Sequence, residues 1–146
     1  MKTVLVFGTF DGLHPGHEFF LKEARKLGDR LVVCIARDTI VEQLKGRPPK
    51  RPEIERREML AETSIVDEVI YGDRQLGSYT IFEHTKPEVI AFGYDQTELK
   101  KDLTRWLATQ SVKIALVDIP SHNPEFYKSS FLNQPFAGNR SGRHSA

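Results

Sequence analysis

Five short apolar runs, rich in β-branched residues, constrain the fold of this chain more than any other feature of its sequence. They occupy residues 3–7, 30–36, 68–71, 89–92 and 113–117. Runs of this length suit parallel strands that are covered on both faces. Segments with a helical spacing of apolar residues separate them, at residues 17–27, 38–44, 52–63, 76–84 and 97–110. The alternation predicts an α/β domain with a parallel sheet and right-handed crossovers.

The size and charge of the chain fit one domain. Its 146 residues can bury a single core, and a formal net charge of +1 provides no general attraction to nucleic acid or to a membrane. The lone Cys34 lies in an apolar run, where we expect core packing and no disulfide framework. With no signal peptide or membrane span in sight, we expect a cytoplasmic protein. We expect the domain to span residues 1–134 and the small, polar residues 135–146 to form a disordered tail.

The segment GTFDGLHPGH, residues 8–17, contains more glycines and polar side chains than a turn between a strand and a helix requires. Ligands of open parallel sheets collect at this position, outside the carboxyl end of a strand. Gly8, Gly12 and Gly16 are expected to allow close approach of the backbone and positive φ angles. Pro15 stiffens the entry to the helix, whose exposed N–H groups would form an anion site. The segment is neither a dinucleotide fingerprint nor a P-loop.

His14 and His17 in this segment admit three interpretations. As a metal pair they lack a third ligand nearby. As structural residues they would cap the helix or satisfy the loop. As donors to phosphate oxygens, which we favour, each ring offers one N–H when neutral and two when charged. A bound anion favours the charged form and the positive helix terminus opposes it, so the sequence leaves the protonation state open.

This segment resembles the signature of the nucleotidyltransferase superfamily, whose His-x-Gly-His loop grips the triphosphate of a nucleotide. The resemblance continues over residues 1–120, through LGDRLVVCIARD, RPEIERREML, VDEVIYGD and KPEVIAFGYDQ. These stretches are similar to the branch that contains glycerol-3-phosphate cytidylyltransferase and the archaeal FAD synthases, and ARD…KGRPP and GYDQ favour the latter. The resemblance implies a Rossmann-like domain with a five-stranded sheet in the order 3-2-1-4-5 and helices on both faces.

The activity that the resemblance implies is transfer of a nucleotidyl group, AMP or CMP, from an NTP to a phosphate monoester with release of pyrophosphate. FMN adenylyl transfer is favoured. Cytidylyl transfer to glycerol-3-phosphate or another alcohol or sugar phosphate is the alternative, and a non-catalytic nucleotide-binding regulatory domain is a second. The second pKa of a phosphate is about 6, so the acceptor is already an anion. The reaction therefore requires alignment and charge neutralisation rather than a general base.

Mg²⁺ is expected to enter with the NTP, without ligands from protein side chains, because the sequence shows no cluster of carboxylates for it. Dimers are common in the resembling family, so a homodimer is compatible with the sequence. Nucleic-acid binding through the basic loop KGRPPKR is a weak third hypothesis, given the balanced charge.

The resemblance assigns roles to further residues. Lys45 and Arg47, in the basic loop, are expected to join the two histidines as catalytic groups at the triphosphate, although such a run is also typical of a solvated linker. Thr9 is expected at the phosphates, while Phe10 and Asp11 shape the loop. The predicted nucleotide-binding residues are Gly8, Thr9, Phe10, Asp11, Gly16, Tyr94, Asp95, Gln96, Lys128, Ser129 and Ser130.

Two later segments carry the remaining predictions. In FGYDQ, Tyr94 is suited to stack on a ring. Asp95 and Gln96 either recognise that ring through hydrogen bonds or begin a helix. NPEFYKSSFLN only echoes the late phosphate-binding segment of the family, and its serines are equally ordinary helix caps. Arg56 is either surface charge or a supporting residue. Asp67 matches the aspartate of an Arg-Tyr-Val-Asp motif whose arginine is Ser64 here.

Overall fold

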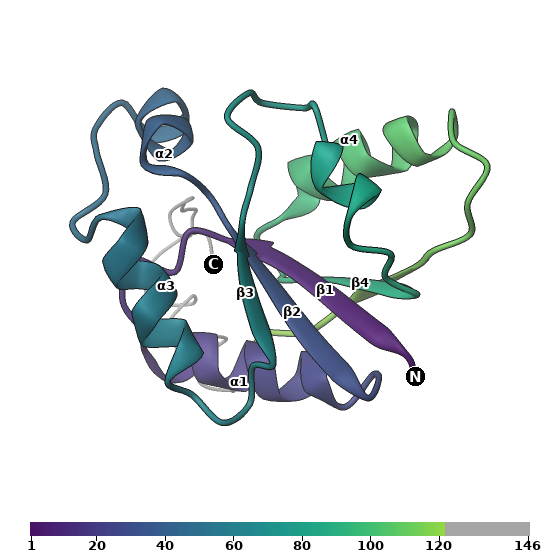
Figure 1. Ribbon diagram of the computed structural model, residues 1–146, viewed down its shortest axis with the longest axis horizontal. Helices are drawn as coiled ribbons and strands as arrows, with labels where there is room; N and C mark the ends of the chain where they lie inside the picture. The colour runs from purple at the N-terminus through teal and green to yellow at the C-terminus, as the bar shows by residue number, and fades with distance from the viewer. Residues whose placement is uncertain (122–146) are drawn as a thin grey trace, which may run out of the picture.

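The computed structural model describes residues 1–121 and contains a five-stranded parallel sheet (Figure 1). Its strand order is β3-β2-β1-β4-β5, so the predicted α/β class and order are confirmed. The strands are β1 (Thr3–Gly8), β2 (Arg30–Ile35), β3 (Glu68–Tyr71), β4 (Val89–Phe92) and β5 (Ala115–Asp118).

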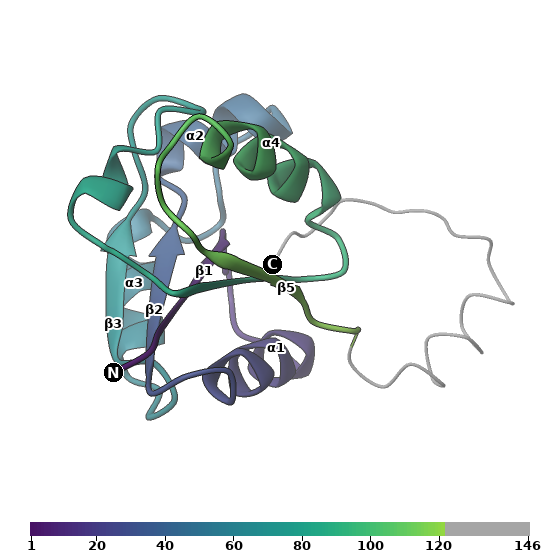
Figure 2. The ribbon, with the colours of Figure 1, turned by 90° about the vertical axis from the view of Figure 1, so that its right-hand side faces the viewer.

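Helices cover both faces of the sheet, as predicted. In Figure 2 the sheet lies between α1 on one side and α4 on the other, and α2 lies beside α4. Within the described residues the helices are α1 (Pro15–Arg25), α2 (Asp38–Lys45), α3 (Glu53–Ala61), the short 3₁₀ helix η1 (Thr80–Glu83) and α4 (Thr97–Leu107).

Alternate residues of each strand enter two different cores. Val4 and Val6 of β1 pack into the core beneath α1 and α3, whereas Leu5 and Phe7 pack with residues of η1 and α4. Because both sides of the strands are buried, the strands read as continuous apolar runs instead of an alternation of apolar and polar residues. This double burial explains why the strands could be located in the sequence.

The helix expected over residues 76–84 is wrong. Gly77 has a φ of 78° and Tyr79 a φ of 53°, both in the left-handed region, where a right-handed helix cannot continue. Residues 72–79 therefore form a loop, and only η1 retains helical geometry. The other four helices begin and end within a few residues of the predicted bounds.

The predicted domain boundary after residue 134 and the tail at residues 135–146 lie outside the described residues, as do Lys128, Ser129 and Ser130. In the part of the chain that the structure describes, every helix is too short or too polar to span a membrane. Gly8 of β1 stands beside Ile35 of β2, and Val6 stands beside Ala91 of β4. This register brings the loops that follow β1, β2 and β4 together at one edge of the sheet, which we call the carboxyl edge.

Candidate active site

His14 is the N-cap of α1. Its Nδ1 accepts hydrogen bonds from the backbone N–H of Gly16 at 3.0 Å and of His17 at 3.4 Å. This network places the proton of the neutral ring on Nε2, which can then donate to a ligand. The sequence suggested exposed N–H groups here, but these two already bond to the imidazole, and Pro15 has none. Side-chain donors must therefore supply much of any anion site at this terminus.

His17 packs its ring against that of His14, with 3.7 Å between ring centroids and 24° between the planes. The edge of the Phe10 ring supports it from another side, at 5.3 Å. Burial, and then the neighbouring His14, lower the pKa of His17 to about 4. The Gly12 backbone opposes this shift, and the charge of Lys45 adds a smaller lowering effect. The ring is thus neutral at pH 7, which the sequence left open.

Nδ1 of His17 is buried, and its approach to the backbone of Gly12 lacks the geometry of an ordinary hydrogen bond. Because this atom has almost no contact with solvent, a ligand cannot reach it without a rearrangement of the loop. An anion bound beside the ring would raise the pKa of His17.

The loop between β1 and α1 holds two residues with left-handed backbone conformations. Phe10 has a φ of 52° and is fully buried, and Gly12 has a φ of 121°. A Cβ atom at Gly12 would lie 2.9 Å from Nη1 of Arg51, so the basic loop approaches the backbone closely here. Gly8 and Gly16, for which positive φ was also expected, do not adopt it.

Asp11 connects this loop to the basic loop that follows α2. Its carboxylate accepts the backbone N–H groups of Lys50 at 2.7 Å and of Arg51 at 2.8 Å. The guanidinium of Arg51 in turn donates to the carbonyl of Asp11 at 3.2 Å. The carboxylate is occupied by these backbone donors, which assigns Asp11 to shaping the loop.

Arg56 on α3 is fully buried and joins several chain segments at the carboxyl edge. Its guanidinium donates to the carbonyls of Arg51, Thr9 and Ala36 at 2.8 to 2.9 Å. It also donates to Oδ1 of Asp38 at 2.7 Å. Its neighbours Glu55 and Arg57 are exposed, so the local sequence does not distinguish Arg56 from surface charge.

Lys45 ends α2 and Arg47 follows it, both exposed. Partial desolvation, together with Arg47 and Arg56, lowers the pKa of Lys45, while Asp11 and Asp95 oppose the shift. Among the described residues neither cation forms an ion pair within 4.0 Å. These positive charges are therefore available to an anion at the carboxyl edge.

Gln96 is buried, and its side chain connects two strand ends. Its amide nitrogen donates to the carbonyl of Phe7 at 2.8 Å, and its amide oxygen accepts the N–H of Gly93 at 2.8 Å. Tyr94, in contrast, has 59% of its surface exposed. The side chain of Gln96 thus connects the ends of β1 and β4, whereas Tyr94 lies at the surface.

Asp67 lies at the opposite edge of the sheet, where β3 begins. Its carboxylate accepts the backbone N–H of Leu31 at 2.8 Å and pairs with Arg25. The structure therefore does not bring Asp67 together with the histidines.

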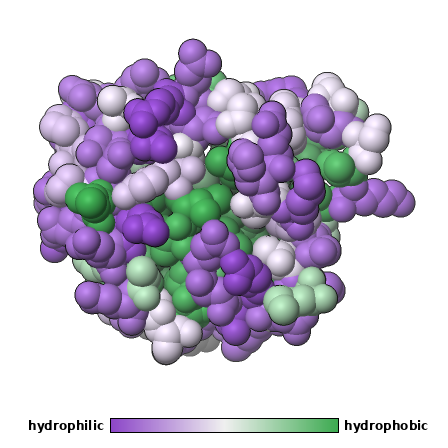
Figure 3. Space-filling model, viewed as in Figure 1, coloured by the Kyte–Doolittle hydropathy of each residue, from purple (hydrophilic) through white to green (hydrophobic). Residues whose placement is uncertain are grey.

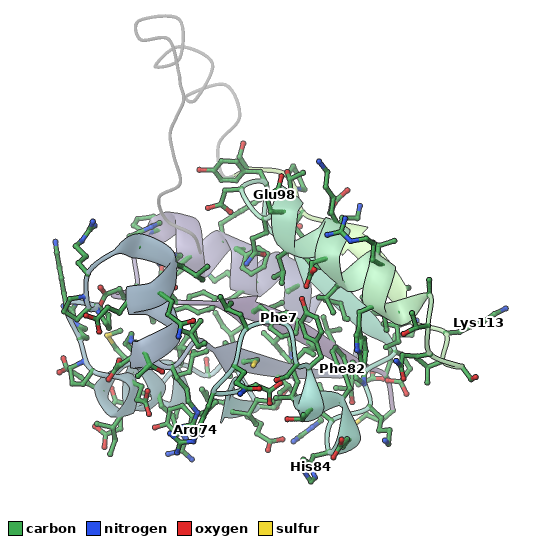
Figure 4. The ribbon with its side chains drawn as sticks, turned by 90° about the horizontal axis from the view of Figure 1, so that it is seen from above. Phe7, Arg74, Phe82, His84, Glu98 and Lys113 are labelled. Atoms are coloured by element: carbon green, nitrogen blue, oxygen red, sulfur yellow. The ribbon has the colours of Figure 1, made fainter. Side chains whose placement is uncertain are left out.

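A cavity of about 410 Å³ opens at the carboxyl edge, beside residues 8–17, which we call the histidine loop. Figure 4 looks down on this edge and shows Phe7, one of its lining residues, between α2 and α4. Figure 3 shows hydrophobic surface near the middle of the view, surrounded by hydrophilic residues. Gly8, Thr9 and Lys45 line the cavity near the histidine loop. The rest of the lining is mostly apolar, with Phe7, Ile40, Leu44, Leu76, Ile81 and Leu99, and it also includes the polar residues Asp73, Gln75, Asp95, Gln96 and Glu98.

These apolar residues are the functional candidates that sequence reasoning missed, together with Asp38. No local signal marks them, because isolated leucines and isoleucines occur throughout the chain. Cys34 also lines the cavity, and burial raises the pKa of its thiol to about 12. The thiol is therefore protonated at neutral pH and unsuited to act as a nucleophile.

The described residues contain no group of three or more histidine, cysteine or acidic side chains placed to hold a metal ion. What the site offers is two imidazoles, two unpaired cations and a neighbouring apolar cavity. Such a set is suited to hold a polyphosphate next to a second substrate, and it provides no nucleophile of its own.

Comparisons with known proteins agree with this geometry. Residues 5–134 match the family model described as cytidylyltransferase-like. Over 122 residues the chain is 39% identical to the FAD synthase of Aciduliprofundum boonei, covering 84% of this chain and 80% of the relative. Over 132 residues it is 40% identical to the FAD synthase of Thermococcus sibiricus, covering 90% and 89%.

A solved structure is also similar. The lipopolysaccharide core biosynthesis protein from Thermoplasma volcanium superposes with a TM-score of 0.77 at 33% sequence identity, over 84% of this chain and 99% of that one.

Proposed function

Since this chain belongs to the cytidylyltransferase-like family and is a nucleotidyltransferase, we propose that it transfers AMP from ATP to FMN and so makes FAD and pyrophosphate. A phosphate oxygen of FMN would attack the α-phosphorus of ATP, and the bond to the bridging oxygen of the β-phosphate would break. The entering phosphate is already an anion, so no group on the protein needs to accept a proton.

One observation supports FMN over a small acceptor: the apolar cavity adjoins the histidine loop through Gly8, Thr9 and Lys45. Its volume of about 410 Å³ lies in the range typical of pockets for drug-sized ligands. A flat ring would bury its faces against apolar walls, while its phosphate would reach the loop. The chain is similar to proteins named FAD synthase, which agrees with FMN as the acceptor.

In this mechanism the histidines hold the triphosphate and stabilise the departing pyrophosphate. Nε2 of His14 donates to a phosphate oxygen, and His17 gains a proton as the anion raises its pKa. Lys45 and Arg47 add positive charge as the pyrophosphate separates. Thr9 is proposed as a further phosphate donor from the end of β1.

Tyr94, which follows β4 and has 59% of its surface exposed, is proposed to stack on the adenine. Asp95 stays a proposed base contact. Lys128, Ser129 and Ser130 stay proposed phosphate ligands that the structure does not describe.

Magnesium fits the site as a companion of the nucleotide. The carboxylate of Asp11 already accepts two backbone N–H groups, while the surroundings of the loop are cationic. These residues suit a complex in which the phosphates hold the ion and the protein holds the phosphates. Bound in this way, Mg²⁺ would neutralise charge on the phosphates. We also propose a cytoplasmic location, in keeping with a free Cys34, and a homodimer, which light scattering would test.

The test is a matrix of pyrophosphate release, with ATP and CTP each combined with FMN, glycerol-3-phosphate and a sugar 1-phosphate. We expect turnover with ATP and FMN, and chromatography should identify FAD as the product. Turnover with CTP and glycerol-3-phosphate alone would replace FMN with the alternative acceptor. Tight ATP binding without turnover in any combination would instead indicate a regulatory nucleotide-binding domain.

A further inference from the structure

Two leucines border the opening of the cavity, and both are unusually exposed. Leu44 on α2 has 63% of its surface exposed, and Leu76 on the loop after β3 has 55%. Both line the cavity, although they come from different segments of the chain. Removing an exposed leucine side chain from water is favourable, so these two form an apolar surface that a ligand could cover.

The loop that presents Leu76 is fixed at both ends. At its base, the carboxylate of Asp73 accepts the backbone N–H of Thr80 at 2.6 Å and also the hydroxyl of Thr80. Near its other end, the hydroxyl of Tyr79 donates to Asp102 on α4. Leu76 lies between these two anchors, next to the left-handed turn at Gly77. Its position is thus set by the loop and not by packing of the leucine itself.

The remaining wall of the cavity determines what can lie beneath the leucines. Phe7, Ile40 and Ile81 are apolar, while the polar lining residues lie on two sides, with Asp73 and Gln75 on the loop after β3 and Asp95, Gln96 and Glu98 at the start of α4. A small polyol phosphate would place hydroxyl groups against apolar walls and would leave both leucines in water. A planar aromatic ring would cover them.

We propose that Leu44 and Leu76 clamp the ring system of the acceptor and so select an aromatic phosphate monoester over a small alcohol phosphate. This inference rests on the proposed function, since it assigns the cavity to the acceptor. The phosphate of the acceptor extends toward Thr9 and Lys45, and the ring lies between the leucines. The two residues contribute to acceptor affinity and have no contact with the nucleotide.

The experiment compares Leu44→Ala, Leu76→Ala and the double variant with the wild type. Ile54→Ala is the matched control, because Ile54 is 59% exposed and does not line the cavity. We expect each leucine variant to raise the KM for FMN by about 5- to 30-fold, which corresponds to partial loss of a leucine contact. The KM for ATP and the melting temperature should stay unchanged, since neither residue is buried. Quenching of FMN fluorescence provides a second measure of acceptor binding without turnover.

The outcomes separate the clamp from the proposed function. If the wild type makes FAD and both leucine variants keep KM and FMN binding within twofold, the clamp is wrong and the function stands. If the wild type neither binds FMN nor makes FAD, the proposed function is wrong and the clamp falls with it. If the variants lose FMN affinity but gain relative activity with glycerol-3-phosphate, the selective role is supported directly.

Discussion

The amino and carboxyl edges of the sheet both carry arginines and acidic residues, but they pair them differently. At the amino edge, where the strands begin, Arg25 pairs with Asp67 and Arg30 pairs with Glu68, and both pairs are partly exposed. At the carboxyl edge, the acidic side chain of Asp11 accepts backbone N–H groups instead of neutralising a lysine. Arg56 is buried there, where it donates to three backbone carbonyls and pairs with Asp38.

The difference shows how one fold separates stability from binding. At the amino edge the two arginines are matched by carboxylates. At the carboxyl edge Asp11 accepts backbone N–H groups and Asp38 pairs with the buried Arg56, so Lys45 and Arg47 have no ion pair within 4.0 Å among the described residues and keep their charge for a ligand. Four measurements would break or sharpen this contrast.

The largest effect is expected from Arg56→Met, compared with Arg25→Met. Removal of the buried guanidinium leaves the carbonyls of Thr9, Ala36 and Arg51 without their donor, and should lower the free energy of unfolding by roughly 3–5 kcal/mol. The Arg25 change should cost under about 1 kcal/mol, since its pair is partly exposed. Urea unfolding at neutral pH measures both. Equal losses would remove the distinction between the edges.

The next effect concerns catalysis. His14→Ala and His17→Ala should each reduce kcat/KM by about 10²–10³, which is the usual cost of losing one well-placed donor to a developing charge. His84→Ala, an exposed change at the end of η1, serves as the control and should leave the rate unaltered. Because His14 also caps α1, the rates should be measured well below the melting temperature of each variant. A loss of less than about threefold in either variant would refute the assignment.

The third effect is a dependence of stability on pH. The pKa of His17 is about 4 in the folded protein and 6.5 as an ordinary histidine. Between these values the unfolded chain binds more protons, so stability should fall as the pH drops from about 6.5 to 4, by up to about 3 kcal/mol from this residue. His17→Asn should flatten the curve in that window. Parallel curves for the two proteins would show that the buried ring does not titrate in this way.

The smallest effect tests the unpaired cation. Lys45→Met should lower kcat/KM for ATP by about tenfold, since one charged contact to phosphate is worth about 1.5 kcal/mol, and the loss should shrink at high salt. Lys2→Met, an exposed change at the amino edge, should have less than a twofold effect. Similar losses for the two lysines would mean that ATP responds to the overall charge of the protein and not to Lys45 in particular.

The sequence predicted the sheet and the histidine loop because both are encoded by contiguous residues. Burial on both faces makes each strand a recognisable run, and GTFDGLHPGH is unbroken. Arg56, Gln96 and Asp11 could not be placed in this way. Their partners lie 47, 89 and 40 residues away, at Thr9, Phe7 and Arg51 respectively, and only the folded chain brings them together.

The failed helix at residues 76–84 has a related cause. Its apolar spacing was real, but Ile81 and Phe82 pack from a single 3₁₀ turn, while Leu76 remains at the mouth of the cavity. An apolar residue that lines a cavity has the same spacing in the sequence as one that packs in the core. The spacing of apolar residues therefore cannot distinguish Leu76 from Ile81.

Phe10 combines a left-handed backbone conformation with a fully buried ring. A non-glycine residue in the left-handed region costs about 1–2 kcal/mol, yet here its ring supports His17 from the side. A glycine at this position would relax the backbone, but it would also remove a fully buried ring from the core, which typically costs about 3–5 kcal/mol. The buried ring therefore more than offsets the strain of its own backbone, and one side chain ties the stability of the fold to the position of the imidazole.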